Sequence, residues 1–372
     1  MRPEASPPAG RALWETPLRI GREHVANRIV FPALSPNWAD AHGRSTAALE
    51  YFYDSVARGG AGMVVVAGTA VSPEGLGSDR TLRLYAEEHR PGLRRLLGLV
   101  REQGCLAAIQ LMHAGGQANP DVIGMSPLSP SGVSCRALGN HPLAMGAPDI
   151  GRVRGQFVQA ALWAHEDGAQ AVELHLAHGY LLHEFLSPRS NLRTDAYGGS
   201  AANRLRLALE IIQAIREAAP GLVIGVRITG EDYLDGGLHT ADVVPIAKAL
   251  ERGGVEYCSV TAGVYDAGPV KHQAMAAGKF FDYAKTIREA VSIPVIGVGR
   301  VGDIPTAEAR LASGTCDLVA IGRGLVADPD MVRRARRGEE PVRCLDCGRC
   351  MYLRQGYPNL DCPLRQFAAV RE

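Results

Sequence analysis

Short apolar runs alternate along this chain with longer segments in which apolar residues recur every three or four positions. The short runs are rich in β-branched residues and predict eight strands, at 28–31, 63–66, 107–111, 171–174, 223–227, 257–260, 294–297 and 318–321. The longer segments predict helices, at 47–58, 89–103, 153–167, 202–218, 241–252, 283–291, 306–313 and 331–337. Strands that are apolar along nearly their whole length are typical of a parallel sheet covered on both faces.

This alternation predicts an α/β fold. Eight strand–helix units in roughly 300 residues fit a TIM (β/α)8 barrel. A doubly wound sheet is the alternative, because the pattern alone does not separate the two arrangements. We place the barrel at 16–340, after a flexible Pro- and Ala-rich tail at 1–15 and before a cysteine-rich extension at 341–372.

Polar residues lie at or just after the ends of several predicted strands, where TIM barrels carry their chemistry. Ser35 follows the first strand, Gln110 lies near the end of the third, and Arg227 ends the fifth. The loops at 113–148 and 177–201 are long for a compact domain, which is typical of functional segments. We therefore expect the site at this end of the barrel.

The fourth strand runs into a cluster of three candidate catalytic residues, His175, His178 and Tyr180. Two imidazoles can bind a substrate oxygen from two sides, and a phenol can deliver a proton nearby. The alternatives are a pair of core histidines or a metal site. No further ligand lies nearby at the spacing that zinc uses.

A glycine-rich motif, Gly-x-Gly-x-x-Gly, occupies 297–302 between a predicted strand and a predicted helix. Too little chain follows it for a complete dinucleotide-binding domain. We interpret the motif as a TIM-barrel phosphate loop, in which glycine amides and arginines bind the phosphate oxygens. The residues concerned are Gly299 and Arg300, with Gly322 and Arg323 after the last strand.

Four cysteines crowd the C-terminal segment: Cys344, Cys347 and Cys350 at two-residue spacing, and then Cys362 before a proline. This spacing is typical of a 4Fe-4S cluster. Structural zinc, the alternative, more often uses two separated pairs. Reduced, unliganded thiols are the remaining interpretation.

The composition gives no support for two classes of partner, nucleic acids and membranes. Lys and Arg number 40 and Asp and Glu 39, so the net charge of +1 gives no reason to expect nucleic acid or an anionic membrane. The chain contains no apolar run of about 18 residues, so no membrane span is predicted. The N-terminus lacks the apolar core of a signal peptide, and we expect a cytoplasmic enzyme with a small-molecule substrate.

The stretch at 175–200, from His-Leu-Ala-His-Gly-Tyr to Tyr-Gly-Gly-Ser, resembles the old yellow enzyme family of FMN-dependent oxidoreductases. The segments at 27–30, 110–117, 226–227 and 322–323 agree with that family in order and spacing. The cysteine segment is similar to the branch containing trimethylamine dehydrogenase and bacterial 2,4-dienoyl-CoA reductase, where it holds a 4Fe-4S cluster. The resemblance covers nearly the whole chain.

The resemblance implies that FMN lies at the carboxyl ends of the strands. The residues near its isoalloxazine ring would be Ala33, Gly68, Gln110 and, toward N1 and the C2 oxygen, Arg227. Those holding its phosphate would be Gly299, Arg300, Gly322 and Arg323. His175 and His178 would hold the substrate oxygen, and Tyr180 would donate the proton.

Two positions depart from the family pattern. Ser35 stands where relatives often have Cys or Thr beside the flavin, and in trimethylamine dehydrogenase a Cys there links FMN covalently. A serine predicts non-covalent FMN. Gly116 replaces the Arg of the usual His-Ala-Gly-Arg string, which opens that edge of the pocket.

The implied activity is ene reduction. NAD(P)H, or a protein partner acting through the cluster, would reduce FMN, and hydride would pass from flavin N5 to the β-carbon of an α,β-unsaturated carbonyl compound. One alternative is an amine or C–H dehydrogenase that passes electrons through the cluster to an external carrier. Another is a non-catalytic flavin/iron–sulfur electron-transfer subunit.

Relatives with the cysteine segment carry a nucleotide-binding portion beyond it, whereas this chain ends at Glu372. We therefore expect no internal NAD(P)H or FAD domain. The sequence leaves open whether the chain forms a homo-oligomer.

Overall fold

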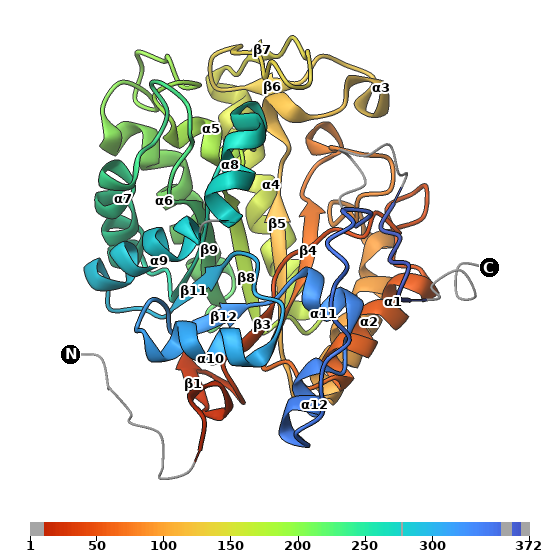
Figure 1. Ribbon diagram of the computed structural model, residues 1–372. Helices are drawn as coiled ribbons and strands as arrows, with labels where there is room; N and C mark the ends of the chain where they lie inside the picture. Colours follow the sequence, from red (N-terminus) through yellow and green to blue (C-terminus); the bar gives the residue numbers. More distant parts are fainter. Residues whose placement is uncertain (1–10, 277, 351–358, 366–372) are drawn as a thin grey trace.

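A computed structural model describes residues 11–276, 278–350 and 359–365. Eight parallel strands close into a barrel, with β12 paired to β3 (Figure 1). In barrel order they are β3 (Ile29–Phe31), β4 (Met63–Ala70), β5 (Leu106–Met112), β8 (Ala171–Leu176), β9 (Val223–Thr229), β10 (Tyr257–Thr261), β11 (Val295–Val298) and β12 (Leu318–Ala320). Each overlaps a predicted strand. The TIM barrel is confirmed, and the doubly wound alternative is wrong.

Helices surround this barrel and connect its strands (Figure 1). Those that overlap predicted helices are α1 (Ala47–Arg58), α2 (Arg90–Glu102), α4 (Ala147–Glu166), α6 (Ala201–Ala218), α7 (Thr240–Gly253), α9 (Lys279–Ala290), α10 (Ile304–Ala312) and α12 (Met331–Arg336). Helix α4 begins before the predicted residue 153. Pro148 suits its first turn, and Asp149 accepts a hydrogen bond from the backbone N–H of Gly146 at 2.9 Å.

Several elements lie outside the predicted pattern, because most are too short to show a hydrophobic period and the longest of them, α8, buries no apolar residue. The strands are β1 (Leu18–Ile20), β2 (Glu23–Val25), β6 (Leu128–Ser129) and β7 (Leu143–Ala144). The helices are α3 (Pro120–Ile123), α5 (Leu181–Leu186), α8 (Gly268–Ala276) and α11 (Arg323–Ala327). The 3-10 helices are η1 (Leu13–Glu15), η2 (Pro73–Gly75), η3 (Glu87–His89), η4 (Gly115–Gln117) and η5 (Tyr265–Ala267).

The two ends of the barrel are covered differently. At the amino end of the strands, the β1–β2 hairpin inserts Ile20 and Val25, both fully buried, into the cluster that fills the barrel interior. Tyr257 also belongs to this cluster, and its ring lies so close to Gly225 that a Cβ there would be 2.0 Å from it. Glycine is therefore required at that position. The opposite end carries β6, β7 and α8 (Figure 1).

Both terminal segments contact the barrel. Residues 1–10 of the predicted tail lie outside the described part, but Trp14 is buried, and the N–H groups of Leu13 and Trp14 donate to Glu308 at 2.9 Å. Barrel contacts thus begin before residue 16. Near the other end, Leu360 is fully buried and donates its N–H to the Pro36 carbonyl at 2.8 Å.

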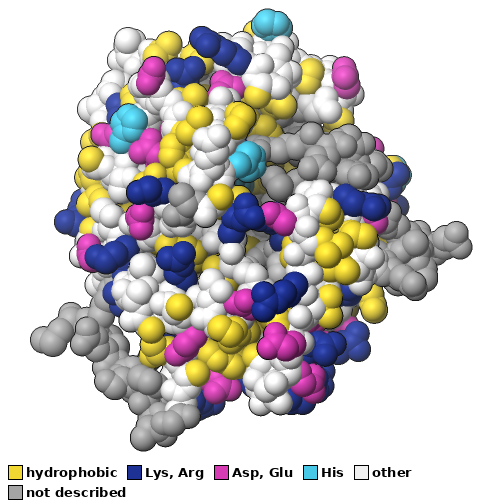
Figure 2. Space-filling view, in the orientation of Figure 1, with side chains coloured by type: hydrophobic (Ala, Val, Ile, Leu, Met, Phe, Trp, Pro, Cys, Tyr) yellow, Lys and Arg dark blue, Asp and Glu magenta, His cyan; other side chains and the backbone are white. Residues whose placement is uncertain are grey.

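Neither sign of charge is concentrated on the face of the molecule that Figure 2 shows. Basic and acidic side chains are interspersed on the face shown in Figure 2, in keeping with the net charge of +1. Among the described residues, no helix combines the length and the apolar character that crossing a membrane requires.

Candidate functional site

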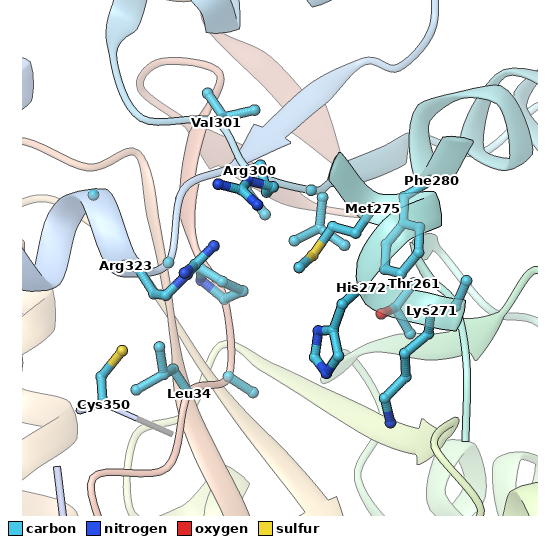
Figure 3. A pocket seen from close by; sticks show the side chains of 18 of the residues that line it. Leu34, Thr261, Lys271, His272, Met275, Phe280, Arg300, Val301, Arg323 and Cys350 are labelled. Carbon is cyan, nitrogen blue, oxygen red and sulfur yellow. The ribbon is translucent and has the colours of Figure 1, made fainter. Parts of the chain in front are cut away.

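A cavity of about 480 Å3 opens at the carboxyl ends of the barrel strands (Figure 3). Its walls come from segments that follow β3, β8, β10, β11 and β12, with one side chain from β9. Eight of the predicted barrel residues line it: Ala33, His178, Tyr180, Arg227, Gly299, Arg300, Gly322 and Arg323. Residues more than 280 positions apart in sequence therefore meet as the barrel pattern predicts.

The other four predicted residues do not line this cavity. His175 is buried beside His178. Gln110 is also buried, and its Nε2 donates to Glu173 Oε1 at 2.7 Å. Ser35 and Gly68 line a separate hollow of about 10 Å3.

The turn after β8 brings the two histidines together. His178 adopts a φ of +63°, in the left-handed region that is costly for a residue with a side chain. Its backbone N–H donates to Thr229 Oγ1 at 3.1 Å, and its carbonyl accepts from Gln117 Nε2 at 3.0 Å. The His178 ring then lies between His175 Nε2, 3.3 Å from its Nδ1, and Thr261 Oγ1, 3.0 Å from its Nε2.

A buried chain of hydrogen bonds through His183 and Asp232 holds this turn in place. The N–H of Gly179 donates to His183 Nδ1 at 3.1 Å, and His183 Nε2 lies 2.9 Å from Asp232 Oδ1. Burial acts to raise the pKa of Asp232, but His183 and the hydrogen bonds from Leu238 N–H and Ser187 Oγ lower it overall. The ionised carboxylate fixes the ring that holds the turn.

Burial controls the charge of the histidine pair. Desolvation is the largest cause that lowers the pKa of His175 and of His178, and the charge of Arg227 lowers both further. Both imidazoles are therefore neutral at pH 7 and act as hydrogen-bonding groups. The Tyr180 ring lies 4.9 Å from the His175 ring, and its hydroxyl is 3.1 Å from that of Tyr265.

Arg227 lines the cavity, and the buried Glu173 lies close enough for the two charges to interact. Arg227 Nη1 donates to the Ala33 carbonyl at 3.1 Å, whereas its Nε has no hydrogen-bond partner among the described residues. Burial raises the pKa of Glu173, opposed by the charge of Arg227 and the hydrogen bond from Gln110. Arg227 thus contributes a positive charge to the cavity wall.

The predicted phosphate loop lies on one side of the cavity. Gly299 has a φ of +144°, and a Cβ there would lie 3.3 Å from the Cβ of Phe280. Arg300, at a φ of +49°, and Arg323 both form ion pairs with the carboxylate of Asp346. Asp346 lies between the first two cysteines of the C-terminal segment and was not predicted as a site residue.

A family model described as the NADH:flavin oxidoreductase / NADH oxidase family matches residues 14–341. The chain belongs to this family. The match confirms the predicted membership of the old yellow enzyme family.

Individual relatives agree with this assignment. The chain is 36% identical to a NADH oxidase of Thermoanaerobacter brockii over 88% of its own length, but spans only 52% of that protein. It is 35% identical to a NADPH dehydrogenase of Bacillus subtilis (strain 168), covering 87% of this chain and 94% of the relative. A solved 2-naphthoyl-CoA reductase shares the fold, with a TM-score of 0.90 and 24% identity, over 97% of this chain and 58% of that one.

The cavity fits the FMN of this family. Arg227 lines the cavity, and its guanidinium carries N–H donors suited to the N1 and C2 oxygen edge of the ring. The backbone at Gly299 leaves little room for a side chain, as close approach to a phosphate requires. Arg300 and Arg323 both form ion pairs with the carboxylate of Asp346, and arginine binds phosphate oxygens in the same way.

The four C-terminal cysteines line one small hollow of about 20 Å3, and Cys344 and Cys350 also line the larger cavity. Within the part of the chain that the structure describes, no group of three or more His, Cys, Asp or Glu side chains has the geometry to hold a metal ion. Residues 351–358, between Cys350 and Cys362, lie outside the described part.

Sequence analysis missed several cavity residues, which are Thr261, Tyr265, Lys271, His272 and Asp346. Thr261 ends β10, one residue beyond the predicted strand, so the strand-end rule could have found it. Lys271 and His272 lie on α8, which was not predicted. No motif marked the helix that carries them.

Proposed function

We propose that this chain is an FMN-dependent ene-reductase, which reduces the C=C bond of an α,β-unsaturated carbonyl compound at the expense of NAD(P)H. The convergence of His175, His178 and Tyr180 beside the candidate flavin cavity carries this proposal. Family membership supports the cofactor and the electron donor.

The side chains have complementary tasks. FMN, when bound, supplies the hydride. The neutral imidazoles of the histidine pair donate hydrogen bonds to the carbonyl oxygen, where negative charge develops as the β-carbon is reduced. Tyr180 lies in contact with His175 and delivers a proton to the α-carbon. A bare electron-carrier subunit needs no such proton donor.

Replacing Tyr180 by Phe removes the proposed proton donor and keeps the ring. Reduction of an enone such as 2-cyclohexenone should slow by about 100-fold or more, the range typical of general-acid catalysis. Reduction of the flavin by NAD(P)H should be unchanged, because it needs no proton from Tyr180. Anaerobic stopped-flow absorbance separates these half-reactions.

The control for this experiment is Tyr51→Phe, since Tyr51 is 42% exposed on α1, outside the cavity. Y51F should match the parent in both half-reactions. Enone reduction by Y180F at the parental rate would show that another group donates the proton.

We further propose that Cys344, Cys347, Cys350 and Cys362 bind a 4Fe-4S cluster. Their spacing supports this, as does the hollow that they share. Since Arg323, Cys344 and Cys350 line both this hollow and the main cavity, a cluster here would adjoin the flavin and could exchange electrons with a protein partner.

Anaerobically prepared protein should contain about four irons per chain and absorb broadly beyond the flavin bands. Cys347→Ser should remove both signals, because it deletes one thiolate ligand. Cys135→Ser is the control, since Cys135 lies on a loop and its thiol bonds Asp266 at 3.2 Å. Metal analysis that finds one zinc and no iron would reject the cluster but leave the flavin assignment intact.

A further inference from the structure

Besides Arg227, two groups of basic side chains line opposite sides of the cavity (Figure 3). Arg300 and Arg323 lie on one side, where the FMN phosphate is expected. Lys271 and His272, from α8, lie across the cavity from them. The flavin phosphate accounts for Arg300 and Arg323, so we ask which other ligand the basic residues of α8 could bind.

Lys271 is held in place rather than extended into solvent. It is only 9% exposed, and its Nζ donates to the Val264 carbonyl at 2.7 Å. The ammonium also lies 5.4 Å from the centre of the Tyr265 ring. A fixed and largely desolvated cation attracts an anion more strongly than a surface lysine does.

This cation lies next to the reacting groups. Tyr265, over which it sits, has its hydroxyl 3.1 Å from that of the proposed proton donor, Tyr180. The charge of Lys271 also contributes to lowering the pKa of His178, after burial, Arg227 and His175. His178 and Lys271 line the same cavity, so a single small ligand can contact both side chains.

We propose that Lys271 binds a carboxylate on the alkene substrate, so that the enzyme prefers α,β-unsaturated carbonyl compounds bearing a second, anionic group. This inference rests on the proposed ene-reductase function. His178 and His175 hold the carbonyl oxygen, Tyr180 faces the α-carbon, and Lys271 holds the carboxylate toward α8. His272 adds a second donor on the same helix.

The test compares two matched substrates, 5-oxocyclohex-3-ene-1-carboxylate and its methyl ester, in which the varied group is not conjugated with the alkene. The parent enzyme should reduce the carboxylate with a kcat/KM at least about tenfold higher. A hydrogen bond to a charged group is worth about 1.5–3 kcal/mol, so Lys271→Met should lower that kcat/KM by about 10- to 100-fold, mainly through KM. Activity with the ester should stay within about twofold.

Two further variants test whether the effect is specific to the positive charge of Lys271. Lys279→Met is the matched control, because Lys279 is an exposed lysine on α9, and it should behave as the parent enzyme does. Lys271→Arg keeps the positive charge and should retain most of the preference for the carboxylate. Flavin content reports whether each variant has folded.

A binding measurement without turnover separates the two proposals. Calorimetry should show that 3-oxocyclohexane-1-carboxylate binds the holoenzyme, and that K271M weakens this binding by the same factor as kcat/KM. If K271M affects carboxylate and ester equally, the inference is wrong while ene reduction stands. If neither alkene is reduced but Lys271-dependent binding remains, the proposed function fails and the anion site stands.

The phosphates of NAD(P)H are the other source of anionic groups at this cavity. The rate of flavin reduction by NADH and NADPH is therefore measured in K271M as well. A variant that slows only this step would assign Lys271 to the dinucleotide and overturn the assignment to the substrate carboxylate.

Discussion

Replacing Arg300 and Arg323 together by alanine should weaken FMN binding by about 100- to 10,000-fold, because each arginine loses a charged hydrogen bond worth about 1.5–3 kcal/mol. Both side chains line the cavity and bind the same carboxylate, that of Asp346, which marks where an anion sits. The measurement is a titration of apoprotein with FMN, in which quenching of the flavin fluorescence reports binding.

Two variants make this result specific. Arg333→Ala removes an exposed arginine on α12 and should leave the Kd for FMN unchanged. Asp346→Asn keeps both arginines but removes the carboxylate that competes with phosphate for them, so FMN should bind at least as tightly as to the parent. A Kd within about threefold of the parental value in the double arginine variant would mean that the phosphate binds elsewhere.

Replacing His175 and His178 together by alanine should slow enone reduction by at least about 100- to 1,000-fold, the usual cost of deleting one donor to a developing oxyanion. FMN content should be unchanged, because neither imidazole belongs to the phosphate loop. Reduction of the flavin by NAD(P)H should be affected far less, since no substrate oxyanion forms in that step. Single-turnover absorbance measurements report each step.

The control for the histidine pair is His24→Ala, on β2 at the opposite end of the barrel, where the side chain is exposed. A double variant that reduces enones at the parental rate would show that His175 and His178 only support the turn after β8. The turn itself should persist in the double variant, because the backbone N–H and carbonyl of residue 178 still bond Thr229 and Gln117, and the N–H of Gly179 still donates to His183.

The sequence predicted the barrel because each strand is a short apolar run in a fixed alternation with helices. The same rule located most of the cavity, since strand ends meet at one end of a closed barrel. It placed Arg227, Gly299 and Tyr180 around one cavity, although they are far apart along the chain. The hydrophobic period gave the strand ends, and the glycine-rich motif and the family resemblance singled out the residues there.

The remaining features depend on contacts that no local pattern encodes. The β1–β2 hairpin is too short for a period to appear. Helix α8 is as long as α10 but buries no apolar residue, so no apolar face marked it and Lys271 escaped attention together with its helix. Asp346 lies among cysteines and reaches the phosphate loop only through the folded path of the C-terminal segment. Ser35 follows β3 as predicted, yet it lines a separate hollow beside Gly68.

The central claim is that the cavity at the carboxyl ends of the strands holds FMN and uses it to reduce an alkene. An anaerobic absorbance titration tests this most directly. Purified or FMN-reconstituted protein should show a flavin spectrum that bleaches with NAD(P)H and returns when an enone is added. Acid should release the FMN, because Ser35 forms no covalent link. Protein that binds no FMN, or reduced flavin that no enone reoxidises, would contradict the account.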